Sequence, residues 1–500
     1  MSPILLFSFV IGYFLILLAV ATYTSRNATN ETVFIGNRNS NWMLVAFGMI
    51  GTSLSGVTFV SVPGTVGNIV NGAYGAFGYF QVILGYIIGY LVIAFVLVPL
   101  YYKLNLTSIY HYLEVRLSRE SYKTGALFFI ISRLFGATAR LYLVINVLQI
   151  FILDRMGVPF VATTAIILIM ILLYTWKGGV KTIVYTDTLQ TSFMLLGLII
   201  CLVFILTQMN ISVGDALERM KSHDYLRVFD TNILNKSFFL KNIIGGAVIA
   251  IAMTGLDQEM MQKNISVKRM QDSQKNILTF TATLVIVNLL FLLLGGLLYL
   301  YMSDKGAVYI EKAFMLNGKN IIGDDLFPSI ALYHLPQGIG IIFIIALISA
   351  LFPSADGALT ALTSSFCIDI LAINRRDDLN ESQRKNTRMT VHLTFAVLFL
   401  CCILIFKWIN NKSIIGVILD LAGYTYGPLL GLFSFGILTK RQINKGFGVT
   451  LICLAAPILC YILSKNASSW LSGYQIGFEL LLINGLITFL GLWLYSKKRH

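Results

Sequence analysis

Thirteen long apolar runs divide this chain and fix the solvent in which most of it folds. About 20 consecutive apolar residues span the hydrocarbon layer of a bilayer. A water-soluble core with a polar shell is excluded, because 57% of the 500 residues are hydrophobic and only 12% are charged. The runs are residues 3–25, 42–70, 75–102, 123–153, 159–176, 182–209, 240–262, 276–303, 336–372, 389–409, 413–438, 447–464 and 473–496. We therefore predict an all-α integral membrane protein with about thirteen transmembrane helices.

The positions of Lys and Arg predict the orientation of these helices. With the N-terminus outside, the segments predicted to lie in the cytoplasm are 26–40, 103–123, 177–181, 263–275, 374–388, 440–445 and the C-terminal tail. These segments hold 23 of the 37 Lys and Arg residues, and the outer segments hold 12. Since cytoplasmic loops carry the excess of basic residues, we expect the N-terminus outside and the C-terminus inside. The net charge of +14 then reflects contact with anionic lipid, and no nucleic-acid role is needed.

Cysteine and histidine residues predict no redox or transition-metal chemistry. All six cysteines fall inside apolar runs, and the five histidines are scattered without paired spacing. Such cysteines are typical of small buried hydrophobic residues rather than of disulfides or metal ligands. The sequence also contains no cluster of nucleophile, base and metal ligands, so we do not expect an enzyme.

Small residues interrupt two of the predicted helices. The second run contains GTSLSGVTFVSVPG at 51–64, and the seventh contains GGAVIAIAMTGLDQEMMQ at 245–262. Such residues also allow close helix packing, but non-helical backbone at membrane depth occurs where it lines a cavity. The two interrupted helices are five apart, which is the interval that an inverted repeat of five helices plus five produces. We therefore predict a binding cavity near the bilayer midplane.

Four segments resemble motifs of the sodium:solute symporter family and occur in the family order. They are GGVKTIVYTDTLQ at 178–190, GLDQEMMQK at 255–263, TSSFCIDI at 363–370 and YTYGPLLGLF at 424–433. The resemblance covers nearly the whole chain and implies a LeuT-type fold in a single transmembrane domain, 1–500. It implies an extra N-terminal helix at 3–25, five-helix repeats at 42–209 and 240–438, and two C-terminal helices within 447–496. It also implies coupling to Na+ and no transition metal.

The same resemblance implies a sodium site between the second and ninth helices. Sodium is a hard ion that takes several oxygen ligands. The matching ligands in this chain are the carbonyl oxygens of Gly51, Leu54 and Ala350 and the hydroxyl of Ser354. Pro353 stands where the family has a further hydroxyl ligand, which is a departure from the pattern.

Asp356 is a carboxylate inside an apolar run, where a charge costs about 2.5 to 3.5 kcal/mol. In some family members the positions that match Asp187 and Asp356 help to bind a second sodium ion. Two other interpretations stay open from the sequence. Asp356 would form a structural ion pair with Arg140 or a loop Lys, or it would belong to a proton relay.

Arg140 lies in ISRLFGATARLYLVINVLQ at 131–149, in the fourth run. Members of the family that carry sialic acid present an Arg from this helix to the substrate carboxylate, and a guanidinium binds a carboxylate through two parallel hydrogen bonds. The alternative is an ion pair with Asp187 or Asp356. Further candidates for binding the solute are Ser53, Ser55 and Thr58 in the first interruption, Phe77 and Gln81 on the next helix, and Asp257 and Gln258 in the second interruption. For Asp257 and Gln258 the alternative is a gate or a hydrogen bond that breaks the helix.

These observations predict a symporter that imports a small polar solute with sodium by alternating access, with a sugar acid such as sialic acid as the leading candidate. A neutral sugar, inositol or another organic anion is the alternative. A transporter-like membrane sensor is disfavoured, because the chain ends at LYSKKRH directly after the last apolar run. The expected partners are the solute, sodium ions and the lipid bilayer of a bacterial inner (cytoplasmic) membrane; the sequence leaves the oligomeric state open.

Overall fold

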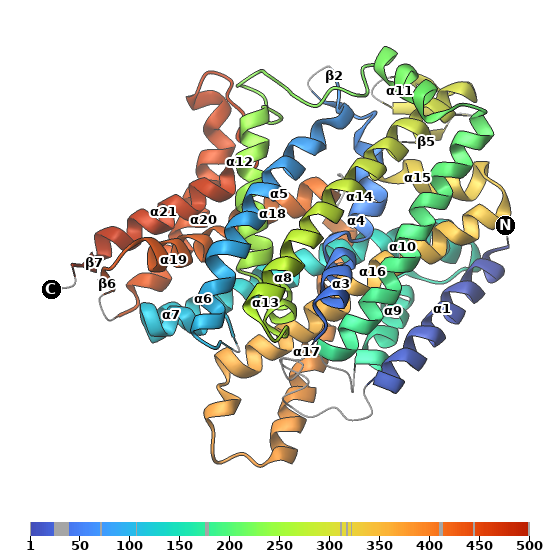
Figure 1. The fold of residues 1–500 in the computed structure, drawn as a ribbon. Coiled ribbons are helices and arrows are strands. Elements are labelled where there is room, and N and C mark those ends of the chain that lie inside the picture. Colours follow the sequence, from blue (N-terminus) through green and yellow to red (C-terminus); the bar gives the residue numbers. More distant parts are fainter. Residues whose placement is uncertain are drawn as a thin grey trace.

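The computed structural model describes residues 2–498 except 25–39, 71–72, 107, 176–179, 311–312, 317–318, 322, 410–413 and 444–445. The predicted cytoplasmic segments 26–40 and 177–181 therefore lie mostly outside the described residues. So do the first two residues of the motif at 178–190. The described chain is built mainly of helices that pack side by side (Figure 1).

The first half of the chain forms nine α-helices among the described residues. They are α1 (Pro3–Thr24), α3 (Trp42–Ser53), α4 (Gly56–Thr65), α5 (Phe80–Val92), α6 (Val98–Lys103), α7 (His111–Arg116), α8 (Arg119–Leu148), α9 (Phe160–Thr175) and α10 (Val180–Met209). Short 3₁₀ turns cover Ala76–Tyr79 and Asp154–Met156, and π-helical turns cover Ile93–Leu97 and Gln149–Leu153.

The second half continues the same architecture. Its helices are α11 (Val213–Ser222), α12 (Phe239–Ala250), α13 (Gln258–Ile265), α14 (Met270–Asp304), α15 (Leu326–Ser329), α16 (Gln337–Ser365), α17 (Glu381–Ile409), α18 (Ile414–Thr425), α19 (Gly427–Leu438), α20 (Gly448–Trp470) and α21 (Leu480–Tyr495). Its π-helical turns are Ile251–Gly255, Ile330–His334 and Phe366–Ile370, and its 3₁₀ turns are Gly323–Asp325 and Ile373–Arg375.

The strands are short and lie in the loops. β1 (Ile69–Val70) pairs antiparallel with β2 (Ala73–Tyr74). β4 (Ala313–Leu316) pairs antiparallel with both β3 (Val308–Ile310) and β5 (Lys319–Ile321). β6 (Gln442–Ile443) pairs antiparallel with β7 (Ser496–Lys497), which ties the end of α21 to the loop after α19.

Both predicted interruptions are breaks in the structure. α3 and α4 meet at an angle of 56°, and the Phe239–Gly255 segment meets α13 at 65°. A third bent pair, α18 and α19 at 46°, was not predicted. The sequence signal for it is the Gly427–Pro428 pair, because proline fits the first turn of a helix and disfavours helix before it.

The described helices confirm a polytopic membrane fold, but the count of thirteen spans is not confirmed. Eight helices are long and apolar enough to cross a bilayer, and eleven spans result if each bent pair counts as one. Two shorter apolar helices, α9 and α21, fall below that length. Each has 16 residues, and a helix rises about 1.5 Å per residue. They therefore cover about 24 Å, which is less than the hydrocarbon layer.

Large apolar side chains face outward on the peripheral helices. Ile169 and Leu173 of α9 are 54% and 55% exposed, and Leu451 and Ile458 of α20 are 64% and 60% exposed. An apolar surface of this extent is unstable in water but matches lipid. Figure 1 places α1 at one edge of the bundle and α20 and α21 at the opposite edge, with α3, α13 and α16 between them.

Glycines bring α5 and α12 into backbone contact. A Cβ atom on Gly85 would overlap the carbonyl oxygen of Ile243 and lie 2.7 Å from the Ala247 nitrogen. A Cβ atom on Gly246 would overlap the Val82 carbonyl oxygen. This contact holds the helix after the first break against the helix before the second, and small residues are what allow such an approach.

Gly85→Ala is expected to destabilise the protein by about 1 to 3 kcal/mol, because the added methyl group meets backbone rather than a movable side chain. The measurement is thermal unfolding in detergent. Gly136→Ala is the matched control, since a Cβ there has nothing within 4 Å. Equal melting temperatures for the two variants would contradict the backbone contact.

Candidate functional site

A cavity lies between the two broken helices. About 90 Å³ of it is open to the centres of water molecules, which is room for several waters. Its lining residues come from both halves of the chain: Thr52, Ser53, Leu54, Ser55, Val57, Thr58, Tyr79, Tyr86, Tyr90, Arg133, Arg140, Ile249, Ala250, Met253, Thr254, Met260, Leu284, Asn288, Ile418 and Leu419.

The structure brings four of the eight predicted solute-binding residues to this cavity. Ser53, Ser55 and Thr58 reach it from the break between α3 and α4, and Arg140 reaches it from α8. Phe77, Gln81, Asp257 and Gln258 are not among its lining residues.

A different face of α5 lines the cavity from the one predicted. Tyr79, Tyr86 and Tyr90 are spaced by seven and four residues, so they share one face of the helix. Gln81 points away from it: its amide nitrogen donates to the Val228 carbonyl and its oxygen accepts from the Asn242 amide. Phe77 packs in the apolar core. The tyrosine spacing was the sequence signal that would have found the correct face.

Asp257 and Gln258 organise the second break instead of facing the cavity. The Asp257 carboxylate accepts from the backbone N–H of Glu259 at 2.9 Å and of Met260 at 3.3 Å, which caps the start of α13. The Tyr426 hydroxyl donates to its other oxygen at 3.2 Å. The Gln258 side-chain oxygen accepts from the Ile109 N–H at 3.0 Å. Both residues therefore have structural partners in the fold.

Arg140 forms no ion pair with any acidic residue in the described part of the chain. The two alternatives that the sequence left open both fail, because Asp187 pairs with Lys263 and Asp356 accepts from the Tyr174 hydroxyl at 2.7 Å. The guanidinium is part of the cavity wall. Arg133, two helical turns earlier on α8, lines the same cavity but is neutralised by acidic partners.

The acidic partners of Arg133 lie on α13 and at its cap. One guanidinium nitrogen forms a short ion pair with Glu259, and the other lies 3.7 Å from an Asp257 oxygen. All three side chains are buried. Because a buried charge requires a compensating partner, this cluster holds α8 against the second break.

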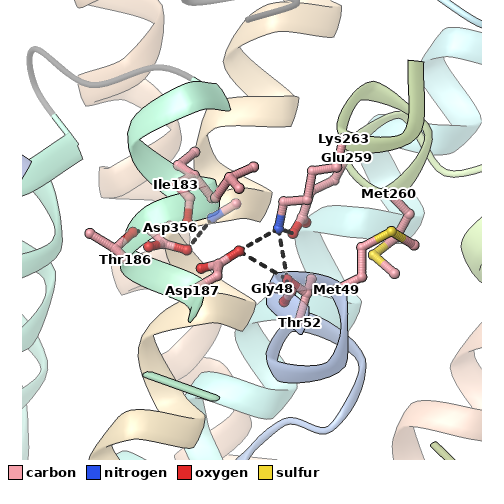
Figure 2. A network of polar contacts seen from close by, with 12 residues as sticks. Gly48, Met49, Thr52, Ile183, Thr186, Asp187, Glu259, Met260, Lys263 and Asp356 are labelled. Carbon is pink, nitrogen blue, oxygen red and sulfur yellow. Dashed lines mark hydrogen bonds and ion pairs between the residues drawn. The ribbon is translucent and has the colours of Figure 1, made fainter. Parts of the chain in front are cut away.

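Figure 2 shows how the cluster continues to α10 through Lys263. The ammonium nitrogen of Lys263 lies 2.7 Å from an Asp187 oxygen, 2.7 Å from the Thr52 hydroxyl and 3.4 Å from a Glu259 oxygen. The order Asp257, Arg133, Glu259, Lys263, Asp187 alternates negative and positive charge from the second break to α10. The prediction that Lys263 begins a cytoplasmic loop is wrong: it belongs to α13 and is 2% exposed.

Asp356 lies beside this cluster but is held by other donors. One of its oxygens accepts from the Tyr174 hydroxyl, and the other accepts from the Gly357 N–H at 2.5 Å. A Cβ atom on the neighbouring Gly357 would overlap the Glu259 carboxylate, so this glycine leaves room for that side chain. Among the described residues no group of three or more His, Cys, Asp or Glu side chains is arranged to hold a metal ion.

Of the six residues predicted to bind sodium, Gly51 and Leu54 lie at the end of α3, and Ala350 and Ser354 lie on α16, which packs against α3. α3 ends at Ser53, and the N–H of Leu54 closes its last turn on Ile50. The carbonyl groups of the final turn, which include that of Gly51, have no intrahelical partner and carry the negative end of the helix dipole. A Cβ atom on Gly56 would lie 4.0 Å from the Ala350 carbonyl oxygen, so α16 passes close to the break.

The hydroxyl of Ser354 is left without a partner by the described part of the fold. It is buried, and its oxygen has no hydrogen-bond partner among the described residues. An unpartnered buried hydroxyl is costly unless a ligand completes it. α16 continues through Pro353, whose ring removes one backbone N–H from the helix. The oxygen atoms at this point therefore suit a hard monovalent cation.

A helical membrane bundle with two matched broken helices around a polar cavity defines a secondary transporter. The chain belongs to the sodium:solute symporter family, whose model matches residues 33–452. Sodium is therefore its coupling ion, and the protein is a transporter rather than an enzyme.

Known relatives cover nearly all of the chain at low identity. It is 23% identical over 447 residues to a sodium/sialic acid symporter of Proteus mirabilis, covering 88% of this chain and 85% of that one. It is 22% identical over 482 residues to a sodium/sialic acid symporter of Aliivibrio fischeri, covering 94% and 90%. It is 21% identical over 474 residues to the sodium/glucose cotransporter 1 of Mus musculus, covering 88% and 68%.

Solved structures confirm the predicted LeuT-type fold. The substrate-bound outward-open state of a Na+-coupled sialic acid symporter matches with a TM-score of 0.81 at 20% identity, over 99% of both chains. A nucleobase-cation-symport-1 family transporter in a closed conformation matches with a TM-score of 0.54 at 12% identity, over 92% of this chain and 93% of that one.

Arg133→Met is expected to destabilise the protein by about 3 to 5 kcal/mol, because it leaves Glu259 and Asp257 buried with less positive charge. Adding Glu259→Gln should restore part of this loss. The measurement is thermal unfolding in detergent, with the exposed Arg155→Met as control. A double variant less stable than Arg133→Met alone would show that the ion pair is not what Arg133 contributes.

Proposed function

We propose that this symporter imports a carboxylate-bearing sugar acid of the sialic acid type together with sodium. The observation that carries the proposal is the Arg140 guanidinium, which lines the central cavity and has no ion-pair partner among the described residues. An uncompensated positive charge at membrane depth is costly. A bound carboxylate would neutralise it through two parallel hydrogen bonds.

The hydroxyl-bearing residues around Arg140 suit a polyhydroxylated solute. Ser53, Ser55 and Thr58 line the same cavity from the first break. Hydroxyl groups both donate and accept, so they would bind the hydroxyls of a sugar ring while Arg140 binds its carboxylate. Two of the relatives are named as sodium/sialic acid symporters, which supports the same class of solute.

We place the coupling sodium ion at the junction of α3 and α16. Its ligands in this proposal are the carbonyl oxygens of Gly51, Leu54 and Ala350 and the hydroxyl of Ser354. The site is next to Ser53 and Ser55 in the same break, so one rearrangement of the break would affect both ligands. A solute that completes the cavity and an ion that fixes the break would then stabilise the same conformation, which is the thermodynamic requirement for coupling.

Neutral solutes are the second candidate. One relative is named as a sodium/glucose cotransporter, and the hydroxyl-bearing wall of the cavity would also suit a neutral sugar or inositol. Neither of them would compensate the charge of Arg140, which is why we favour an acid.

The membrane arrangement belongs to the same proposal. We place the protein in a bacterial inner membrane with the N-terminus outside and the C-terminus inside, because this orientation puts most of its basic residues in the cytoplasm. The two five-helix repeats would occupy 42–209 and 240–438, so that each contains one of the two matched broken helices.

A screen of purified protein tests the class of solute. Melting temperatures are measured with sugars, sugar acids, amino acids and simple carboxylates, with and without sodium. A ligand that binds the folded state raises the melting temperature. We expect a sodium-dependent rise with sugar acids, and a rise with neutral sugars or inositol alone would overturn the carboxylate assignment.

Ser354→Ala is expected to raise the sodium concentration for half-maximal uptake by about tenfold or more, because a ligand oxygen to a charged partner contributes about 1.5 to 3 kcal/mol. Uptake into proteoliposomes at varied sodium provides the measurement. Ser349→Ala is the control on the same helix, since its hydroxyl already donates to the Ile345 carbonyl at 2.7 Å. An unchanged sodium dependence in Ser354→Ala would remove this residue from the site.

Arg140→Lys keeps the charge but loses the two-pronged guanidinium, so the solute should bind about tenfold or more weakly while sodium binding changes little. Calorimetry with solute and with sodium separates the two affinities. Arg155→Lys, at an exposed position, is the control. If sodium affinity fell in parallel with solute affinity, Arg140 would act on the structure of the site rather than on the solute.

A further inference from the structure

We propose that the ammonium group of Lys263 is a built-in cation that occupies the carboxylate site of Asp187, so that the protein moves one sodium ion with each solute. The inference rests on the proposed symport function and specifies its ion coupling. It replaces the second sodium ion that the family resemblance implied at Asp187 and Asp356.

The contacts of Lys263 are those of a cation in an oxygen cage. Its three N–H groups have three oxygen partners, on Asp187 of α10, Thr52 of α3 and Glu259 of α13. All three partners are buried. The Thr52 hydroxyl in turn lies 3.2 Å from the same Asp187 oxygen. Every donor of the ammonium group is therefore used, and no solvent is needed to complete its coordination.

A free sodium ion would have to share the Asp187 carboxylate with this ammonium group. Two positive charges about 4 Å apart repel by about 4 kcal/mol at the effective dielectric constant of a protein. Lys263 is also attached to the chain, so its local concentration does not depend on the sodium concentration in solution. The Lys263 ammonium group therefore excludes a sodium ion from the Asp187 carboxylate as long as it stays protonated.

Asp356 is held by donors other than Lys263. Both of its oxygens already accept hydrogen bonds, from Tyr174 and from the Gly357 N–H. Figure 2 shows Asp356 on the far side of Asp187 from the Lys263 ammonium. Asp356 is therefore oriented by Tyr174 and the Gly357 N–H, whereas the Lys263 ammonium group contacts one oxygen of Asp187.

Glycines allow the close helix packing around the Lys263 ammonium group. A Cβ atom on Gly48 would lie 3.3 Å from the Asp187 Cβ, and one on Gly51 would overlap the Thr191 hydroxyl, so α3 packs closely on α10. Gly357 leaves room for the Glu259 carboxylate on the other side. The cage is thus formed by packing of three helices and not by a chance rotamer of one side chain.

Counting ions in proteoliposomes tests the inference. Uptake of radiolabelled sodium and of the transported solute is measured in parallel, and the sodium dependence of uptake is fitted for its steepness. The wild-type protein should move one sodium ion per solute. Lys263→Met removes the ammonium group and frees the Asp187 carboxylate, so the ratio should rise to two and the sodium dependence should steepen.

Three further variants separate the role of Lys263 from general effects. Lys263→Arg keeps a cation and should keep the ratio at one. The Lys263→Met, Asp187→Asn double variant removes the freed site and should also give one. Lys241→Met is the matched control, because Lys241 is a buried lysine whose nitrogen donates to the Asn235 and Gln475 carbonyls, away from the cavity lining.

A wild-type ratio of two would overturn the inference, as would a ratio of one in folded Lys263→Met. If Lys263→Met does not accumulate as folded protein, the test uses the other two proteins. A sodium-to-solute ratio of two in the wild type or in Lys263→Arg would then overturn the inference. An absence of any sodium-dependent uptake by the wild type is a different outcome, because it would overturn the proposed function instead.

Discussion

Charge compensation inside the membrane is the constraint on which the centre of this protein depends. Five charged side chains alternate in sign from Asp257 at the second break to Asp187 on α10. A single buried charge would cost several kcal/mol, so each member of the series fixes the position of the next. The series runs through α8, α13 and α10, and Lys263 also contacts the Thr52 hydroxyl of α3, so both broken helices are tied to the helices around them.

The breaks themselves follow from the same low-dielectric environment. Lipid offers no partner to a free carbonyl or N–H group, and the unwound backbone of Leu54 and Leu256 is therefore buried inside the bundle. Helix ends then face a cavity, and the carbonyl end of α3 favours a cation. In the proposed function the solute and the ion share this break, so that binding of one would favour binding of the other.

Arg140 and Lys263 show two uses of a positive charge in one protein. Lys263 has three buried oxygen partners from the chain itself, whereas Arg140 lines the cavity without an ion-pair partner in the described residues. The first charge is satisfied in the folded protein, and the second is the one to which we assign the solute carboxylate in the proposed function.

The sequence by itself determined the membrane class and both helix breaks, because hydropathy and helix-breaking residues act locally. It also placed Arg140 at the cavity. The prediction for α5 chose the wrong face, because apolar residues surround that helix, although the spacing of Tyr79, Tyr86 and Tyr90 marks the face that meets the cavity. The sequence also placed Lys263 in a loop, because a charge at the end of an apolar run looks solvated. Only the tertiary structure decided otherwise: Gly48 and Gly51 bring α3 against α10, and Asp187 then meets a lysine 76 residues away in the chain.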